Sequence, residues 1–316
     1  MQWMFDVQRQ VTHDTAVEVG YQGNAGRKLE RLRMYNEALL RTGPNDTRTP
    51  AQRRPWGSAY GQIQTVDNVV NSNYHAASVK VQRRFSKGLT YLAGFTFSKA
   101  IDNGSGIRPY GFENILAKNS YDLQGERGLS QFHTSKRFVS SILYEIPAGP
   151  GHLVGRQMGR LAKVFEGWQV GTILTFSDGT PLTVGGIGDI ANLGLSNSAN
   201  FPDATGLSPI PDDRSASRFW NIQAFDPTNP QLAYRFGTTG RNTLLTPGVR
   251  QWDFSVAKHT RIHESHTLEF RFEAFNFPNH PNWNTPATDS RNASTFGIVT
   301  SARTMREIQF SLKYVF

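Results

Sequence analysis

Residues 306–316, Arg306-Glu307-Ile308-Gln309-Phe310-Ser311-Leu312-Lys313-Tyr314-Val315-Phe316, place an apolar side chain at every second position. Successive side chains of a β-strand point to opposite faces of the sheet. The stretch therefore predicts a strand with one apolar and one polar face. The apolar face holds Ile308, Phe310, Leu312, Tyr314 and Phe316. Soluble sandwiches also contain such strands, so the rest of the chain decides what surrounds this one.

The same alternation recurs upstream in eight stretches of about ten residues, the length a tilted strand needs to cross a bilayer. We therefore predict an all-β fold, a part of an antiparallel transmembrane β-barrel with nine strands that follow one another as a meander. The eight stretches are 2–10, 15–23, 74–85, 89–100, 137–146, 167–176, 251–260 and 266–276.

The connections between these stretches alternate in length. Short turns are expected at 12–14, 86–88 and 261–264, with a longer connection, 147–166, on the same side. Outer-membrane barrels have short periplasmic turns and long extracellular loops, whereas long loops are uncommon in soluble sandwiches. We expect four long extracellular loops at 24–73, 101–136, 177–250 and 277–305.

Aromatic and basic residues agree with that orientation. If the last strand runs toward the periplasm, Trp3 and Trp252 begin strands at the outer interface and Trp168 begins one at the inner interface. Tryptophan at both water boundaries is typical of membrane barrels. Lys258 and Arg83 are in phase with the apolar faces near the periplasmic ends, where long side chains reach water.

The composition excludes several classes of protein. Hydrophobic residues make up 38% of the chain and no run of about 18 of them exists, which excludes a membrane-spanning helix. The net charge of +9 comes from scattered residues, and the densest basic region, 27–54, also holds acidic ones, so nucleic-acid binding is not expected. Without cysteine, neither disulfides nor thiolate metal sites can form.

The chain begins Met1-Gln2-Trp3-Met4-Phe5-Asp6-Val7, which already alternates as a strand. It lacks the charged start and the apolar core of a signal peptide. We therefore expect a piece of a longer outer-membrane protein: a fragment, the product of a truncated gene or one domain of a longer chain.

Several motifs resemble the TonB-dependent outer-membrane receptors of the Oar-like kind. They cover most of the chain: Tyr21-Gln22-Gly23 with Gly26-Arg27-Lys28-Leu29, 72–76, 84–89, 97–102, Gly240-Arg241-Asn242, Pro247-Gly248 with Trp252-Asp253-Phe254-Ser255, 272–281 and 296–312. One departure lies in 130–138, where His133 and Lys136 stand at positions that are usually Asp and His in this family, so no role is carried over to them.

The resemblance implies a barrel of about 22 strands with an N-terminal plug and an energy-coupling box. Residues 1–316 would be the C-terminal portion of that single barrel, without plug, signal peptide or earlier strands. The implied partners are outer-membrane lipid and, in the whole protein, the plug, the TonB energy-coupling system and the barrel-assembly machinery. The end of the chain resembles the signal that this machinery reads, carried by Phe310, Leu312, Tyr314 and Phe316. Alone, the chain should be an open, curved sheet with two unpaired edges.

Charged residues on the polar faces are the candidates for contact with a plug or a substrate. They are Lys80, Arg84, Glu269, Arg271 and Glu273. The alternative is that they pair with one another across neighbouring strands, which stabilises a sheet by about 0.2–1 kcal/mol per pair.

Other chemistry is not expected. His259, His263 and His266 with Glu264 resemble a metal cluster but straddle a tight turn. The loop 186–191 matches a loose dinucleotide fingerprint without a following helix, and the aspartates of the same loop (Asp189, Asp203, Asp212 and Asp213) lack EF-hand spacing. His75 and His133 have no nucleophile or acid beside them in a known motif.

The sequence therefore predicts no enzyme, no cofactor and no metal. The expected function is part of an energy-coupled transporter in the bacterial outer membrane, for a substrate that the sequence does not identify. The alternative is a surface-exposed barrel whose long loops mediate adhesion without transport.

Overall fold

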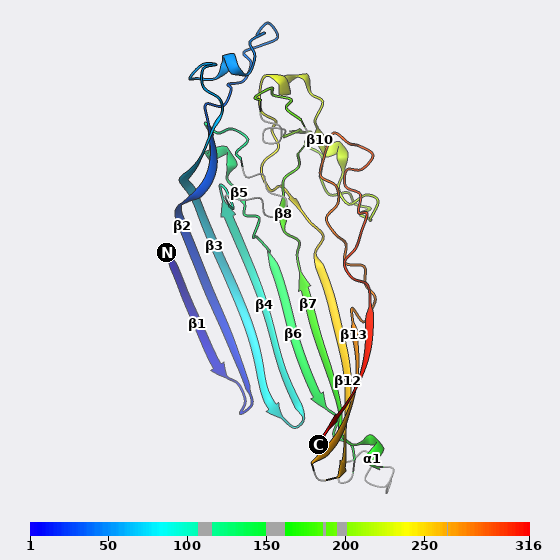
Figure 1. Cartoon of the computed structure of the whole chain (residues 1–316). Helices are drawn as coiled ribbons and strands as arrows, with labels where there is room; N and C mark the ends of the chain where they lie inside the picture. Colours follow the sequence, from blue (N-terminus) through cyan, green and yellow to red (C-terminus); the bar gives the residue numbers. More distant parts are fainter. Residues whose placement is uncertain (107–115, 150–161, 186–187, 195–200, 264) are drawn as a thin grey trace.

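A computed structural model describes residues 1–106, 116–149, 162–185, 188–194, 201–263 and 265–316. Nine long strands form one antiparallel sheet in which each strand pairs with the next long strand along the chain (Figure 1). They are β1 (Gln2–Gln10), β2 (Thr15–Tyr35), β3 (Ile63–Ser86), β4 (Leu89–Asp102), β6 (Lys136–Glu145), β7 (Trp168–Ser177), β12 (Val249–His263), β13 (His266–Phe275) and β14 (Glu307–Val315). The predicted all-β meander of nine strands is confirmed.

The remaining elements are short. β5 (Gly128–Leu129) extends the main sheet beside β4, and two small hairpins pair β8 (Pro181–Leu182) with β11 (Leu244–Leu245) and β9 (Asp203–Ala204) with β10 (Phe225–Asp226). The single described α-helix, α1 (Ala162–Phe165), lies at the end with short turns (Figure 1). Within the described residues, no helix is long and apolar enough to cross a membrane.

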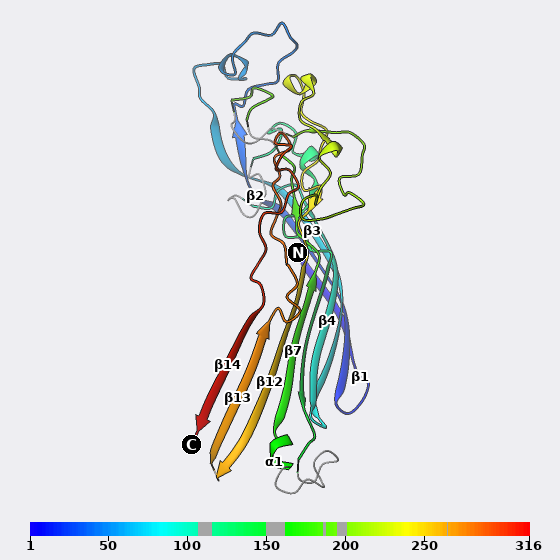
Figure 2. The same cartoon turned by 90° about the vertical axis from the view of Figure 1, so that its right-hand side faces the viewer.

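The sheet is open and curved. Strand pairing runs in one line from β1 to β14, and no described pairing joins these two edge strands. Two perpendicular views show the sheet bending around the side that faces the viewer in Figure 1, with long loops at one end and short turns at the other (Figures 1 and 2). This is the arrangement expected for part of a wide barrel.

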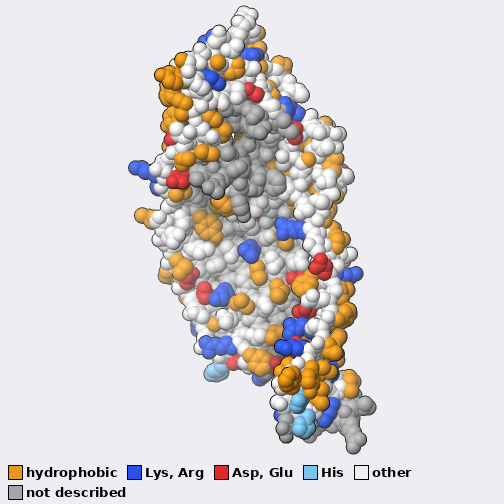
Figure 3. All heavy atoms as spheres, viewed as in Figure 1, with side chains coloured by type: hydrophobic (Ala, Val, Ile, Leu, Met, Phe, Trp, Pro, Cys, Tyr) orange, Lys and Arg blue, Asp and Glu red, His pale blue; other side chains and the backbone are white. Residues whose placement is uncertain are grey.

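Register gives the sheet one apolar and one polar face. Phe310 pairs with Phe272, which pairs with Val256, and on the neighbouring strands Phe176, Phe138 and Phe95 are opposite one another. Because directly opposite residues share a face, these rows form one continuous apolar face. We call it the lipid face and the other one the polar face. Charged side chains of both signs lie over the strands on the side that Figure 3 shows.

One predicted loop is partly wrong. Residues 24–73 were expected to be a loop, but β2 and β3 stay paired out to Tyr35 and Ile63. The pairing shifts register between Gly26 and Glu30, where Lys28 adopts φ 54°. Beyond this bulge the strands carry many charged and polar residues, so no apolar period of two marked them as strands.

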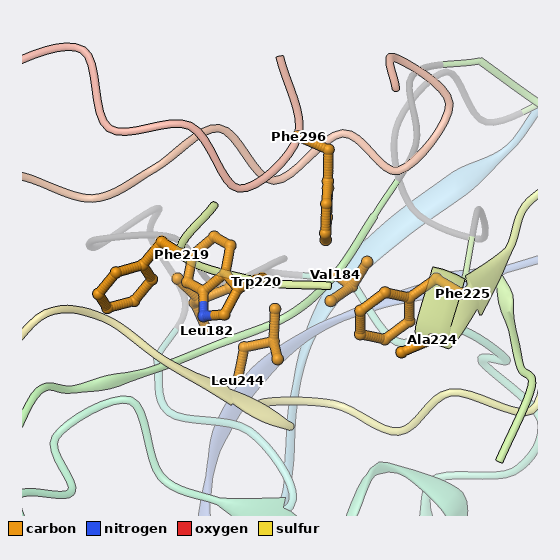
Figure 4. Close-up of a cluster of buried hydrophobic side chains, with 8 residues drawn as sticks. All are labelled: Leu182, Val184, Phe219, Trp220, Ala224, Phe225, Leu244 and Phe296. Atoms are coloured by element: carbon orange, nitrogen blue, oxygen red, sulfur yellow. The ribbon is translucent and has the colours of Figure 1, made fainter. Parts of the chain in front are cut away.

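The long loops pack on one another at the outer end. We call residues 36–62, 103–135, 178–248 and 276–306 the outer loops. Their largest apolar cluster joins residues that lie far apart in the chain: Leu182, Val184, Phe219, Trp220, Ala224, Phe225, Leu244 and Phe296 (Figure 4). Phe296 comes from the last outer loop and the other seven from the third. The outer loops therefore have a core of their own beyond the membrane strands.

Candidate functional site on the polar face

Lys80 lies on the polar face of β3. Its Nζ is 3.7 Å from Glu18 Oε2 on the neighbouring strand β2, and both residues stand directly opposite each other in the register. The side chain remains 45% exposed, so the pair still meets water. Such an exposed cross-strand pair is worth about 0.2–1 kcal/mol.

Three of the other candidates, Glu269, Arg271 and Glu273, lie together on β13. Arg271 donates to Glu269 at 2.6 Å and approaches Glu273 at 3.7 Å. Gln309 on β14 donates to Glu273 at 2.5 Å, and His259 on β12 comes within 4.0 Å of Glu269. One arginine thus compensates two carboxylates, and neighbouring strands supply further contacts.

Arg84 lies apart, near the short turns. It lines a cavity of about 270 Å³ with residues of β1, β2 and their turn, among them Gln8 and Asp14. Four strands, β4, β6, β7 and β12, separate β3 from β13 in the sheet. The five predicted residues therefore form two groups on the same face rather than one site. Three of them pair with one another along β13, whereas Lys80 pairs with Glu18, which is not among the five. Whether they contact a plug or a substrate stays a prediction.

Carboxylates are distributed unequally between the two faces. Leaving aside the extension of β2 and β3 at residues 27–35 and 63–71, every carboxylate of the nine described long strands has the register of the polar face. These residues are Asp6, Glu18, Asp102, Glu145, Asp253, Glu269, Glu273 and Glu307. A face of this kind binds water or a polar partner, whereas the opposite face suits hydrocarbon.

A buried arginine network lies at the outer end of the polar face. Arg241 binds the carboxylate of Asp102 and donates to Glu126 O at 2.8 Å, and Arg31 donates to the Glu126 carboxylate at 2.9 Å. The side chains of all four residues are at most 3% exposed. The network ties the third outer loop to β4, to the second outer loop and to β2.

Sequence reasoning singled out the motifs that hold two of these residues but missed their contact. Asp102 ends the motif 97–102 and Arg241 is the centre of Gly240-Arg241-Asn242, which lies 139 residues later. Asn242 belongs to the same joint, because its side chain donates to Leu129 O at 2.7 Å and it adopts φ 55°. No local sequence pattern signals such a contact. The resemblance to Oar-like receptors therefore singled out these residues but did not predict that they contact one another.

Burial and pairing shift the pKa of several groups in the outer loops. Burial raises the pKa of Glu37, whose carboxylate accepts from Ser120 N at 3.3 Å. Burial lowers the pKa of Lys118, whose Nζ donates to Gly237 O at 3.0 Å. Hydrogen bonds from Arg235 lower the pKa of Asp203 to about 2. These groups stabilise loop conformation and face no open cavity that is described.

The histidines near the last tight turn do not gather around a metal position. Among the described residues no group of His, Asp and Glu has metal-binding geometry. The His263 and His266 rings lie 6.4 Å apart, and His266 Nδ1 is 2.6 Å from the Tyr314 hydroxyl on β14. Glu264 lies outside the described residues.

Most of the remaining residues that the sequence analysis considered as functional candidates have structural partners. Asp189 accepts from Leu193 N at 2.7 Å and Gly194 N at 2.5 Å, which closes a loop turn, while residues 186–187 of the dinucleotide-like stretch lie outside the described part. Asp213 pairs with Arg218 at 2.9 Å. His133 is buried, accepts from Ala100 N at 3.3 Å and has its pKa lowered by burial. Lys136 begins β6 and is exposed.

The inner interface has the predicted basic and aromatic residues. Lys258 Nζ donates to Val164 O and Glu166 O, both at 2.9 Å, at the end of α1, and lies 5.2 Å from the Trp168 ring. The ammonium group thus leaves the lipid face and reaches carbonyl groups on the short-turn side, as expected for a lysine near a bilayer boundary.

The residues of the predicted assembly signal lie on the lipid face of the edge strand β14. Phe310 contacts Phe272 with ring centroids 5.4 Å apart, and Tyr314 contacts Phe316 at 6.0 Å. Phe310, Leu312 and Phe316 are highly exposed. Their role in assembly stays a prediction.

An open meander of tilted strands with one apolar face, one polar face and long loops at one end defines a transmembrane β-barrel of the bacterial outer membrane. The family model of the outer membrane beta barrel domain matches residues 1–309. The chain belongs to this family, and its location is the bacterial outer membrane.

One similar solved structure is the outer membrane transporter YddB from Escherichia coli, with a TM-score of 0.48 and 10% sequence identity. The match covers 99% of this chain and 32% of that chain, so this chain spans about a third of the length of the transporter. No curated protein matches.

Proposed function

We propose that the chain is part of a TonB-dependent transporter of the Oar-like kind, which imports a substrate through the outer membrane. The observation that carries the proposal is the polar face. All strand carboxylates defined above have the register of this face, and Lys80, Arg84 and Arg271 add positive charge. In a complete barrel this face would surround a polar interior large enough for a plug and a substrate.

The motifs add specific support. The residues that resemble Oar-like receptors include Asp102, Arg241 and Asn242, and these tie the outer loops to the strands. Loops held in this way present a defined surface above the barrel interior. Such a surface suits capture of a substrate before it passes into the interior.

The test is energy dependence of uptake in cells that carry the full-length gene. A deletion strain should grow poorly on at least one nutrient from a panel, and the gene should restore growth. Dissipating the proton gradient, or inactivating the energy-coupling protein, should abolish the restored uptake without changing the amount of receptor. Uptake that continues without energy coupling would contradict the proposal.

An adhesion barrel is the second candidate. Large apolar side chains of the outer loops are exposed at Leu39, Trp56, Tyr60, Leu207 and Ile210, as a binding surface for another protein requires. Adhesion would not depend on energy coupling. Cell attachment lost in the deletion strain, together with normal growth on every nutrient, would favour this candidate.

We further propose that the barrel performs no chemistry on its substrate. Among the described residues that suggested a catalytic or metal site, His133, Asp189 and His266 have the structural partners given above. Purified receptor should return a bound substrate unchanged, which mass spectrometry would verify.

A further inference from the structure

Apart from Asp178, which follows the end of β7 and stands opposite Lys136, the charged residues in the register of the lipid face are basic. The strand carboxylates point to the polar face, but several lysines and arginines share the register of the apolar side chains. Arg9, Arg83 and Lys258 do so near the short turns. At the opposite, outer end lies a second set, which we call the outer basic belt: Arg27, Lys99, Lys136, Arg250 and Arg306.

Register places the belt residues on the lipid face. Lys99 follows Phe97 at the next position of the same face, and Lys136 is directly opposite Phe97. Arg250 is opposite Phe176. Arg306 precedes Ile308 by two residues, and the Arg27 guanidinium binds the side chain of Asn73, which is two residues from the lipid-facing position of His75.

Four of the five belt residues, all except Arg27, also lie at nearly one height. Lys136 is two residues below Lys99 in the ladder, because it pairs with Phe97. Arg250 is level with Phe138 and thus two residues below Lys136. Arg306, which is level with Trp252 through the ends of β13 and β14, is two residues below Arg250. Lys99 and Lys136 lie on adjacent strands. Each of the other two steps, from Lys136 to Arg250 and from Arg250 to Arg306, spans two strand spacings.

Strand tilt explains this stagger. In Figure 1 strands β1 to β7 lean so that their lower ends lie to the right, and directly paired positions therefore rise toward the outer end from each of these strands to the next. With a tilt of about 40° and a strand spacing of about 4.8 Å, the directly paired position on the next strand lies closer to the outer surface. The difference in height is a little more than the height that one residue spans along a tilted strand. A stagger of two residues at each step returns the belt to nearly the same distance from the outer surface.

The belt cations lack carboxylate partners. Within the described residues none of the five forms an ion pair at 4.0 Å or less, and all five are exposed. The carboxylate of Asp178 lies at this edge but is partly buried and accepts from Ser135 Oγ at 2.5 Å. Unpaired cations at a membrane boundary attract the anionic groups of lipids.

We propose that the outer basic belt binds the phosphate groups of lipid A, the phosphorylated glycolipid anchor of lipopolysaccharide in the outer leaflet. Lysine and arginine form charge-assisted hydrogen bonds with phosphate oxygens, and arginine does so through two parallel N–H groups. Trp3 and Trp252 lie on the same face and at the same end, at the depth where aromatic rings meet head groups. The proposal depends on the outer-membrane location and not on transport.

The first test compares two triple variants of the full-length protein. The belt variant is Lys99→Gln, Lys136→Gln and Arg250→Gln. The control, Arg9→Gln, Arg83→Gln and Arg137→Gln, removes the same charge from the inner end of the lipid face and from the polar face. After purification in mild detergent, lipid A retained per protein should fall about tenfold in the belt variant, since several charge-assisted contacts are lost. The control should match the wild type.

A second test uses only the wild type, so it holds even if the belt variant fails to assemble. The full-length protein is placed in phosphatidylethanolamine vesicles that contain bisphosphorylated lipid A, dephosphorylated lipid A or phosphatidylglycerol. Only phosphorylated lipid A should raise the thermal unfolding midpoint. An equal rise with dephosphorylated lipid A would assign the effect to the acyl chains, and an equal rise with phosphatidylglycerol to any anionic lipid. Either result, or equal retention of lipid A by both triple variants, would overturn the proposal.

Discussion

At the scale of single residues, the pair Arg241 and Asp102 has the largest predicted energetic effect. Removing one partner of a buried ion pair leaves an uncompensated charge, which costs about 3–5 kcal/mol. Arg241→Ala should therefore open the outer loops, measured as faster proteolysis of residues 201–248 on intact cells. Asp102→Ala combined with Arg241→Ala should be less damaging than Arg241→Ala alone. Arg218→Ala, which breaks the exposed pair with Asp213, serves as the control and should change little.

Gly167 is a second position at which a single added carbon atom, the Cβ of alanine, should destabilise the fold. It adopts φ +75°, and an added Cβ would lie 2.2 Å from the carbonyl oxygen of His259 on the neighbouring strand. Gly167→Ala should lower the free energy of unfolding by about 2 kcal/mol or more, because both strain and a clash with the backbone result. Gly94→Ala is the matched control within a strand, since nothing lies within 4 Å of its added Cβ. Urea unfolding in lipid vesicles would compare them, and equal losses would refute the steric explanation.

Asp203 makes the third outer loop sensitive to acid. Hydrogen bonds from Arg235 lower its folded pKa from 3.8 to about 2, so ionised Asp203 stabilises the folded loop above the unfolded value. This contribution should be complete above about pH 3.8 and should disappear as the pH falls through about 2. Hydrogen exchange of residues 201–248, corrected for its intrinsic pH dependence, should show protection decreasing in this window. Asp203→Asn should lower protection at neutral pH and remove this decrease, and an unchanged decrease would assign it to another group.

At the scale of elements, the sequence predicted most strands well. β1 has the predicted bounds, and six of the other strands differ by only a few residues, because one apolar face imposes a period of two wherever a strand crosses lipid. The extensions of β2 and β3 were missed since they leave the lipid and no longer need that period. The contacts of Arg31, Asp102 and Arg241 could not be predicted either, because they depend on loops brought together only by the complete fold.

The final strand is the element whose side chains suggest a role in assembly. Phe316 is 86% exposed at the end of the free edge strand, so it contributes little to packing in the described structure. Deleting Phe316 from the full-length protein should nevertheless reduce the folded, heat-modifiable form in the membrane severalfold, if the assembly machinery reads this end of the strand. Lys313→Ala, a change on the polar face of the same strand, is the control. Normal assembly without Phe316 would contradict the role.

At the scale of the whole molecule, the open edges determine how this chain behaves alone. β1 and β14 each pair on one side only among the described residues, and each therefore has a row of unpaired backbone groups along about nine residues. In hydrocarbon each unsatisfied group costs several kcal/mol, so an isolated open sheet cannot be stable in a bilayer. In water its apolar face and free edges favour association with other copies.

The isolated chain should therefore fail the two tests that a closed barrel passes. Residues 1–316 expressed alone and mixed with detergent or lipid should show no heat-dependent shift in electrophoretic mobility and should be digested by protease, whereas the full-length protein should shift and resist. The physical reason is that only ring closure removes both edges, and the curvature of nine strands in a wide barrel does not bring β1 to β14. A compact, protease-resistant monomer with a heat-dependent shift would mean that these nine strands can tighten and close, and the polar face would then enclose a narrow interior instead of lining a wide one.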